Sequence, residues 1–452
     1  MPSQRVSNRF LSVPLPHQQV PAGQESGRGP TSKGQFDPGL VNPGRRQFLQ
    51  ALGLAGVAAH CPNRLLAGVA PNTKPRIAAI MTEYRGYSHA DVIVGRLLQG
   101  HILSLQETYW PRTQVVSMYV DQFPKSDLSR GMANQYGAQM APSIEQALTL
   151  GTDQLAVDGV VIIGEHGDYP HNEKGQHLYP RRRFFEETVR TFEKTGKTAP
   201  VFNDKHLGFA WKDAKWMVDQ ARAMKFPLMA GSSLPTAWRK PDLEYPLEVD
   251  LEEGLAIGFG GIEAYGFHAL ETLQCMIERR RGGESGVHAV TCLEGDAVWQ
   301  AARQGKWSRE LLQAALEPVE NKPNGPPEEL CKSPAAFLIE HTDGFHSSVI
   351  MLNGYTGAFG FAGKQRKKST ADATHFWLQE PEFGHFAYLT HNIETMILEQ
   401  QELYPPERTL LTTGILDAVM TSRHQGHLRL ETPWLEQVTY RAPEKPGRRA
   451  RI

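Results

Sequence analysis

Cysteine is scarce in this 452-residue sequence, and neither an excess of one charge nor a long apolar run is present. The four cysteines (Cys61, Cys275, Cys292 and Cys331) form no paired framework and no CxxC spacing, which argues against structural disulfides and a cysteine zinc site. The 48 basic and 49 acidic residues leave a net charge of −1, so no field gathers nucleic acid and we expect no such partner. No run reaches the roughly 18 apolar residues of a membrane span, so we expect none in the mature chain.

The first 70 residues are expected to be a leader. Residues 1–42 are rich in Pro, Gly, Ser and Gln, a composition that predicts disorder. Arg45 and Arg46, followed by Phe48 and Leu49, precede a short apolar run and resemble the twin-arginine export signal. We therefore expect cleavage near Ala70 and a periplasmic or otherwise exported protein.

Residues 75–245 alternate between short apolar runs and helical segments, as a parallel sheet with crossover helices requires. The composition, with 40% hydrophobic and 21% charged residues, supports a large core, and the length predicts two domains. The expected strands are 76–81, 115–120, 158–164, 200–204 and 227–231. The expected helices are 89–98, 126–136, 143–150, 181–195 and 211–224. This pattern predicts a Rossmann-like doubly wound α/β domain, whose ligands bind beyond the carboxyl ends of the strands.

Several stretches in this half resemble the nucleotide-binding half of the Gfo/Idh/MocA oxidoreductases. They are SDLSRGMANQYGAQMAPSIEQAL, VDGVVIIGEHGDYP, PVFNDKHLGFAWKDAKWMVDQA and PLMAGSSLPTAWRKP, in the family's order and spacing. The resemblance implies a sugar or polyol substrate and NAD or NADP as cofactor. It also implies catalytic roles for Lys205, which matches the lysine of a Glu-Lys-Pro signature, and for His268. In this sequence Asp204 and His206 flank the lysine. His268 lies in GFGGIEAYGFHALETL, which resembles the segment that opens the family's second domain, and Ala264 replaces the aspartate that the family usually has four residues before the histidine.

The turn after the first strand departs from the dinucleotide fingerprint. That fingerprint uses glycines so that backbone amides can approach a pyrophosphate. The turn here reads TEYRGYSHADVIVG and contains one glycine, Gly86, among bulky side chains. We expect any dinucleotide to be held by Gly86, by the charge of Arg85, by Asp121 at the ribose, and by Glu165 after the central strand.

The polar loop after the central strand, EHGDYPHNEKGQH, is a second candidate site. His166 and Asp168 are expected to act in catalysis, because imidazole and carboxylate groups at a strand end can exchange protons. His166, Asp168 and His171 could instead hold a divalent metal, although their spacing matches no known metal signature.

Residues 246–441 are expected to form an α+β domain with a mostly antiparallel open sheet, because long alternating stretches are joined by turns such as TDG. We expect a homo-oligomer to form through this sheet. The stretch HFWLQEPEFGHF is expected to be its last element, and residues 442–452 to be a loose basic tail.

Three functions fit these observations. The first is an exported NAD(P)-dependent oxidoreductase of a sugar or polyol. The second is a non-redox lyase, isomerase or hydrolase of modified sugars, with or without a metal, that has lost dinucleotide binding. The third is a carbohydrate-binding protein without turnover. Fold alone does not choose among them.

Overall fold

The computed structural model describes residues 74–104, 107–379 and 383–451. The expected leader, with Arg45 and Arg46, therefore lies outside the described residues. Within them, no helix has the length and the apolar character that crossing a membrane requires.

The first sheet is parallel throughout and has the strand order β5-β4-β1-β6-β7-β8. Its strands are β1 (Arg76–Met81), β4 (Gln114–Val120), β5 (Gln139–Met140), β6 (Gly159–Ile163), β7 (Val201–Asp204) and β8 (Leu228–Gly231). The connecting helices are α2 (His89–Gln99), α3 (Ser129–Tyr136), α4 (Ile144–Thr149), α5 (Arg181–Thr195) and α6 (Trp211–Met224). The strand order reverses between β1 and β6, which makes this a doubly wound Rossmann-like sheet. The expected fold is confirmed here.

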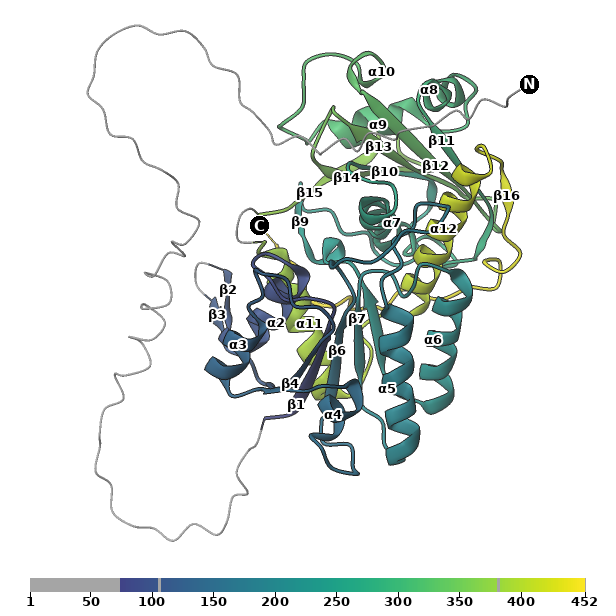
Figure 1. Ribbon diagram of the computed structural model, residues 1–452. Coiled ribbons are helices and arrows are strands. Elements are labelled where there is room, and N and C mark those ends of the chain that lie inside the picture. Colours follow the sequence, from purple (N-terminus) through teal and green to yellow (C-terminus); the bar gives the residue numbers. More distant parts are fainter. Residues whose placement is uncertain (1–73, 105–106, 380–382, 452) are drawn as a thin grey trace, which may run out of the picture. The chain divides into compact units, whose positions relative to one another are not determined.

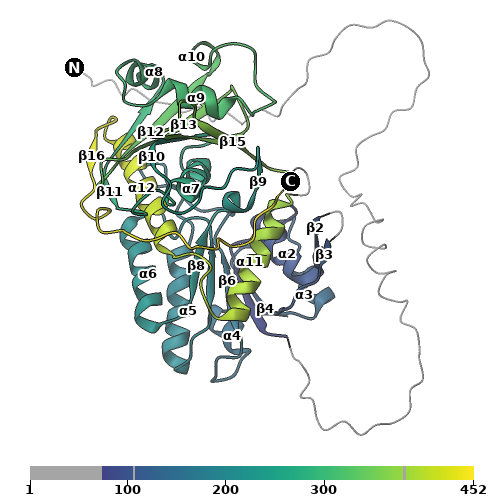
Figure 2. The same ribbon diagram turned by 180° about the vertical axis from the view of Figure 1, so that it is seen from behind.

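Each face of the first sheet is covered by helices, because its strands carry apolar residues on both sides. Helices α4, α5 and α6 pack on one face. Helices α2 and α3 pack on the other face, together with α11 (His385–Glu399), which comes from the second half of the chain (Figures 1 and 2). A short hairpin, β2 (His101–Ser104) and β3 (Glu107–Tyr109), lies outside this sheet.

The second sheet has eight strands in the order β16-β11-β12-β13-β10-β14-β15-β9, and only the β10–β13 pair is parallel. Its strands are β9 (Trp238–Lys240), β10 (Leu251–Gly258), β11 (Val287–Glu294), β12 (Ser333–His341), β13 (His346–Asn353), β14 (Phe359–Gln365), β15 (Asp372–Trp377) and β16 (Leu430–Glu431). The mostly antiparallel sheet is confirmed. β9 already belongs to it, although this strand precedes residue 246.

Helices cover both faces of the second sheet. Helices α7 (Ala264–Ile277) and α12 (Glu407–His424) pack on one face. On the other face lie α8 (Asp296–Arg303) and α9 (Arg309–Leu316) (Figure 1). The rings of Trp299 and Trp307 are buried in this layer. Two short helical turns complete the chain, η1 (Leu234–Thr236) and α10 (Pro327–Leu330). A homo-oligomer through this sheet stays a prediction. Because helices cover both faces, the contact between subunits would have to be made by an edge strand or by these helices.

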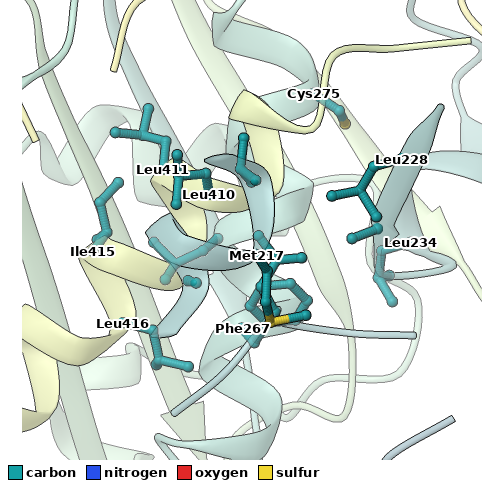
Figure 3. Close-up of a cluster of buried hydrophobic side chains, with 14 of the residues drawn as sticks. Met217, Leu228, Leu234, Phe267, Cys275, Leu410, Leu411, Ile415 and Leu416 are labelled. Carbon is teal, nitrogen blue, oxygen red and sulfur yellow. The ribbon is translucent and has the colours of Figure 1, made fainter. Parts of the chain in front are cut away.

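A continuous apolar core joins the two sheets. Helix α7 and helix α12, from the second half of the chain, pack against α6 and β8 of the first half. Figure 3 shows Met217 of α6, Leu228 of β8, Phe267 of α7 and Leu411 of α12 in this cluster. The first sheet and α7 are thereby fixed relative to each other, which positions residues of both halves around one site.

Two local predictions were wrong. The stretch HFWLQEPEFGHF is not one strand, because β15 ends at Trp377 and His385 begins α11. The tail is not loose either. Arg449 is buried in ion pairs with Asp242 and Glu244, and the backbone N–H of Ala450 donates to the carbonyl of Thr236.

Candidate functional site

The chemically active side chains gather where β1, β6, β7 and β8 end. These strands are neighbours in the parallel sheet, so their carboxyl ends meet at one edge. The chain continues from β6 into Glu165 and His166, from β7 into Lys205, and from β8 into Ser232. Helix α7 brings His268 to the same edge.

Glu165 is the centre of a buried charged network. Its carboxylate accepts a hydrogen bond from Lys205 Nζ at 2.8 Å and another from the Arg181 guanidinium. Burial alone would raise the pKa of Glu165, but the charges of Lys205 and Arg181 outweigh burial and hold it well below its usual range. Gly164 allows this packing, since a Cβ there would lie 2.5 Å from Cγ of Arg181. The network fixes the ammonium group of Lys205 at the sheet edge.

His89, the first residue of α2, forms a dyad with Asp204, the last residue of β7. Its Nδ1 atom lies 2.6 Å from Oδ2 of Asp204, whose side chain is buried. A carboxylate on Nδ1 holds the proton there and leaves the lone pair on Nε2, the arrangement that orients a general base. Nε2 makes no hydrogen bond to any residue in the described ranges.

Ser232 fixes the opposite tautomer on His268. Its Oγ atom lies 2.6 Å from His268 Nδ1 and accepts a hydrogen bond from the Leu234 backbone at 3.0 Å. The Ser232 hydroxyl therefore donates its proton to Nδ1 of His268, and the imidazole proton is on Nε2. Burial, followed by the charge of Lys205, lowers the pKa of His268 well below its usual value, so the ring is a neutral donor at pH 7.

His166 adopts the left-handed backbone conformation, with φ of +69°, and Lys205 does so too, with φ of +60°. Such conformations are uncommon outside glycine and asparagine and cluster at functional sites. Burial lowers the pKa of His166 to about 4, and within the described residues its buried Nε2 atom has no hydrogen-bond partner. His166 is therefore a neutral imidazole with unused bonding capacity.

Two further imidazoles lie close to His89 at this edge. The ring of His89 lies 5.5 Å from that of His166 and 6.5 Å from that of His268, between centroids. Phe386 of α11 lies 5.2 Å from His89 and gives the group an apolar side. The cluster thus combines one oriented base, His89, with one neutral donor, His268, beside the ammonium of Lys205.

The structure does not bring the three predicted metal ligands together. Asp168 is exposed, and its backbone bonds to the side chain of Gln122. The ring of His171 stacks on that of His177, with 4.2 Å between the ring centroids. No group of three or more His, Cys, Asp or Glu side chains that could hold a metal occurs in the described ranges. The metal site is not supported, and Asp168 does not join the imidazole cluster.

The turn after β1 does not fit a pyrophosphate as built. Counting from the strand, Met81 and Glu83 stand where the first two fingerprint glycines would be, and only Gly86 matches. A Cβ on Gly86 would meet nothing within 4 Å, so no close approach requires this glycine. The carboxylate of Glu83 is bound by Arg85 at 2.6 Å, so that arginine is already paired.

The amides at the start of α2 are also used by the chain itself. The backbone N–H of Tyr87 donates to the Asp91 carboxylate at 2.9 Å, and Ser88 caps the helix. An acidic side chain thus takes the place at this helix end that favours phosphate in nucleotide-binding folds. Asp91 would oppose a diphosphate at the turn, and Glu83 already holds the arginine that could bind one.

Asp121 lies at the end of β4, as expected for a ribose ligand, but its oxygens are engaged. They accept hydrogen bonds from Tyr119 and Tyr169, each at 2.7 Å, and from Arg183 at 2.6 Å. Burial alone would raise the pKa of Asp121, but these three donors keep it below its usual value. A carboxylate offers about four acceptor sites, so little capacity is left for ribose hydroxyls.

Sequence reasoning missed His89, Ser232 and the role of Arg181. His89 is the first residue of the predicted helix 89–98, and only its position directly after the β1 turn indicates a site. Arg181 is the first residue of the predicted helix 181–195, and no pattern in the sequence indicates that its side chain is almost fully buried against Glu165 and His206.

No family model matches the sequence, and no curated protein matches it. Solved structures do match over most of the chain. GenD2 from gentamicin A biosynthesis, in complex with NAD, aligns with a TM-score of 0.51 and 12% identity, covering 82% of this chain and 99% of GenD2. Scyllo-inositol dehydrogenase from Lactobacillus casei aligns with a TM-score of 0.47 and 10% identity, covering 80% and 98%. Myo-inositol dehydrogenase from Corynebacterium glutamicum gives 0.47 and 12%, covering 79% and 98%.

The chain has the two-domain fold that the resemblance to the Gfo/Idh/MocA oxidoreductases implied. The alignment with GenD2 carries this conclusion, since it extends through both sheets at a TM-score above one half. At 12% identity it shows the fold, and the chemistry has to be argued from the site.

Proposed function

We propose that this protein is an enzyme that moves protons on a small sugar-like substrate, in an isomerisation or elimination that needs no nicotinamide. The hydrogen bond of 2.6 Å between His89 and Asp204 carries the proposal, because it creates an oriented base beside the ammonium of Lys205. The site also lies at the switch point where ligands bind in doubly wound sheets.

The proposed chemistry begins with a carbonyl-bearing sugar. Nε2 of His89 takes the proton from the carbon next to the carbonyl, and the electron pair of that C–H bond moves to the carbonyl oxygen. Lys205 faces the negative charge on this oxygen, and the Nε2–H of His268 donates a hydrogen bond to it. The hydroxyl group on that carbon passes its proton to the former carbonyl oxygen and becomes the new carbonyl, while His89 returns its proton to the former carbonyl carbon. This completes an isomerisation in which no electrons leave the substrate.

The non-redox form is favoured by the turn after β1. Asp91 opposes a diphosphate there, Glu83 already holds Arg85, and Tyr119, Tyr169 and Arg183 occupy most of the acceptor sites of Asp121. The positions of His89, Lys205 and His268 do not require a dinucleotide bound at that turn. An enzyme that keeps the cleft and lacks the dinucleotide cradle has this combination of features.

A second candidate is an NAD(P)-dependent oxidoreductase of a sugar or polyol. The fold shared with GenD2, whose structure holds NAD, and the position of Lys205 at the end of β7 favour it. The two candidates separate on the purified protein. Nicotinamide at about one equivalent, detected by mass spectrometry after denaturation, would support the oxidoreductase. Turnover by nicotinamide-free protein, followed as exchange of substrate C–H for deuterium in D2O, would support proton transfer.

We also propose export by the twin-arginine route, on the basis of Arg45, Arg46 and the apolar run after them. Replacing both arginines by lysine in the full chain should retain the protein in the cytoplasm. Unchanged export of that variant would contradict the proposal.

A further inference from the structure

The hairpin formed by β2 and β3 is held to the rest of the protein by few contacts. Its strands pair with each other and with no other strand in the described part of the chain. A lone two-stranded hairpin is marginally stable in water, so its order depends on what it packs against. It packs on α11, where Tyr388 donates a hydrogen bond to the carbonyl of Leu103 at 2.9 Å (Figures 1 and 2). Among the described side chains of the hairpin, His101 and Leu103 are the buried ones.

His101 is one of these two anchors, yet its ring nitrogens are not bonded. The ring packs against Tyr109, its neighbour across the hairpin, with 5.0 Å between the ring centroids. Tyr109 in turn lies 5.2 Å from the ring of His391 on α11. Both ring nitrogens of His101, and Nδ1 of His391, are buried and have no hydrogen-bond partner among the residues that the structure describes. The hairpin is thus docked on α11 through a cluster of two imidazoles and one phenol.

The surroundings of this cluster oppose a proton on either imidazole. Burial, followed by the charge of Arg96 in the last turn of α2, lowers the pKa of His101 to about 4. The carbonyls of Arg96 and Ala387 favour the proton, but burial and charge outweigh them. Burial, followed by the charges of Arg448 and Arg112, also lowers the pKa of His391. Both rings are therefore neutral at pH 7 while the hairpin is docked.

The carboxylates near the cluster are engaged elsewhere. Glu107 of β3 forms an ion pair with Arg448 of the C-terminal segment at 2.5 Å, and this hydrogen bond keeps the pKa of Glu107 below its usual value. Glu394 of α11 accepts a hydrogen bond from the backbone N–H of Thr113 at 2.9 Å. Imidazole is the side chain whose ordinary titration falls between pH 5 and 8, so the two histidines are the groups of this interface that respond to mild acid.

We infer that the β2–β3 hairpin is a pH-sensitive latch on α11, closed near neutral pH and opened in mild acid by protonation of His101. The closed form binds the proton less tightly than the open form, in which the ring is in water. The latch therefore loses stability as the pH falls below about 6.5, and the loss is complete below about 4. Between pH 7.5 and pH 5.5, the equilibrium should shift toward the open form by about tenfold. This inference does not depend on the proposed function.

The test is hydrogen–deuterium exchange of the full chain at pH 7.5 and pH 5.5, with exchange times corrected for the intrinsic effect of pH. Opening in peptides from residues 101–112 should increase about tenfold at pH 5.5, whereas peptides from β6 should not change. His101→Phe keeps a ring against Tyr109 but cannot take a proton, so it should lose most of the acid effect. His424→Phe replaces an exposed histidine at the end of α12 and should keep it.

Three results would overturn the inference. They are hairpin exchange that does not change with pH in the wild type, an equally large acid effect in His101→Phe, or an NMR titration of the wild type that gives His101 an ordinary pKa of about 6.5. The titration uses the wild type, so it decides the question even if His101→Phe does not fold.

Discussion

Nδ1 of His89 lies 2.6 Å from the carboxylate of Asp204, although 115 positions separate the two residues in the sequence. The pair forms because β1 and β7 both flank β6 in the parallel sheet, so the turn after β1 faces the end of β7. It is the feature from which the proposed chemistry is built.

His89→Gln and Asp204→Asn should each lower kcat/KM by about 10²–10⁴-fold, because a positioned general base contributes that much. Glutamine keeps a hydrogen bond to Asp204 but cannot take a proton. The measurement is steady-state kinetics on the substrate found by screening. His424→Gln, an exposed histidine at the end of α12, is the matched control. Retention of more than about a tenth of the activity in His89→Gln would exclude it as the base.

Lys205→Met should abolish activity and also destabilise the fold by about 1–3 kcal/mol, because it leaves the buried charge of Glu165 with Arg181 alone. Adding Glu165→Gln should restore part of the stability, since less uncompensated charge remains. It should restore no activity. Urea unfolding and the kinetic assay measure the two effects separately. Recovery of activity in the double variant would show that Lys205 is structural only.

Glu271 of α7 predicts a specific pH dependence. Burial raises its pKa from 4.5 to about 7, while Thr412 and the backbone of Ser232 donate hydrogen bonds to it. The folded state therefore binds the proton more tightly than the unfolded state, and this group's contribution to stability falls as pH rises from about 4.5 to about 7. The free energy of unfolding of Glu271→Gln, relative to that of the wild type, should therefore be higher at pH 8 than at pH 4, by about 3 kcal/mol.

Urea unfolding of the wild type and Glu271→Gln at both pH values measures this difference. The glutamine can accept from Ser232 and donate to Thr412, so its hydrogen bonds are kept. An equal difference in stability at the two pH values would mean that Glu271 is ionised in the folded protein.

Arg408 and Glu278 form a buried pair that ties α12 to α7, with Nε of Arg408 at 2.8 Å from Oε2 of Glu278. Tyr440 donates to the same carboxylate at 2.9 Å. Arg408→Met should cost about 3–5 kcal/mol, because it leaves a buried carboxylate without its cation. Arg408→Met combined with Glu278→Gln should cost clearly less. Similar unfolding free energies for the single and double variants would show that the lost charge balance is not the cause.

The sequence carried enough information for the first sheet and for part of the site. The five longer parallel strands fall within the predicted ranges, which are rich in apolar residues, and α5 and α6 begin and end at the predicted residues. Lys205 and Glu165 could be placed at the sheet edge because both directly follow buried strands. His268 was placed by family resemblance, and the packing of α7 on the first sheet brings it there.

The remaining features depend on contacts that no local pattern encodes. The metal hypothesis assumed that His166, Asp168 and His171 project together, but positive φ values at His166 and Gly167 turn the chain between them. Nothing in the sequence around Arg181 indicates that its side chain is buried in an ion pair with Glu165. The spacing of apolar residues in α8 and α9 gives each helix an apolar side, but it does not say which face of the second sheet that side packs against.

The most direct test of the account is deuterium exchange into substrate by nicotinamide-free protein. Wild type, His89→Gln and Asp204→Asn are stripped of any nucleotide, incubated in D2O with a panel of aldoses, ketoses and uronic acids, and followed by proton NMR. The account predicts loss of a C–H signal next to a carbonyl with the wild type and not with the two variants. Exchange that requires added NAD or NADP, or that continues unchanged in His89→Gln, would contradict it.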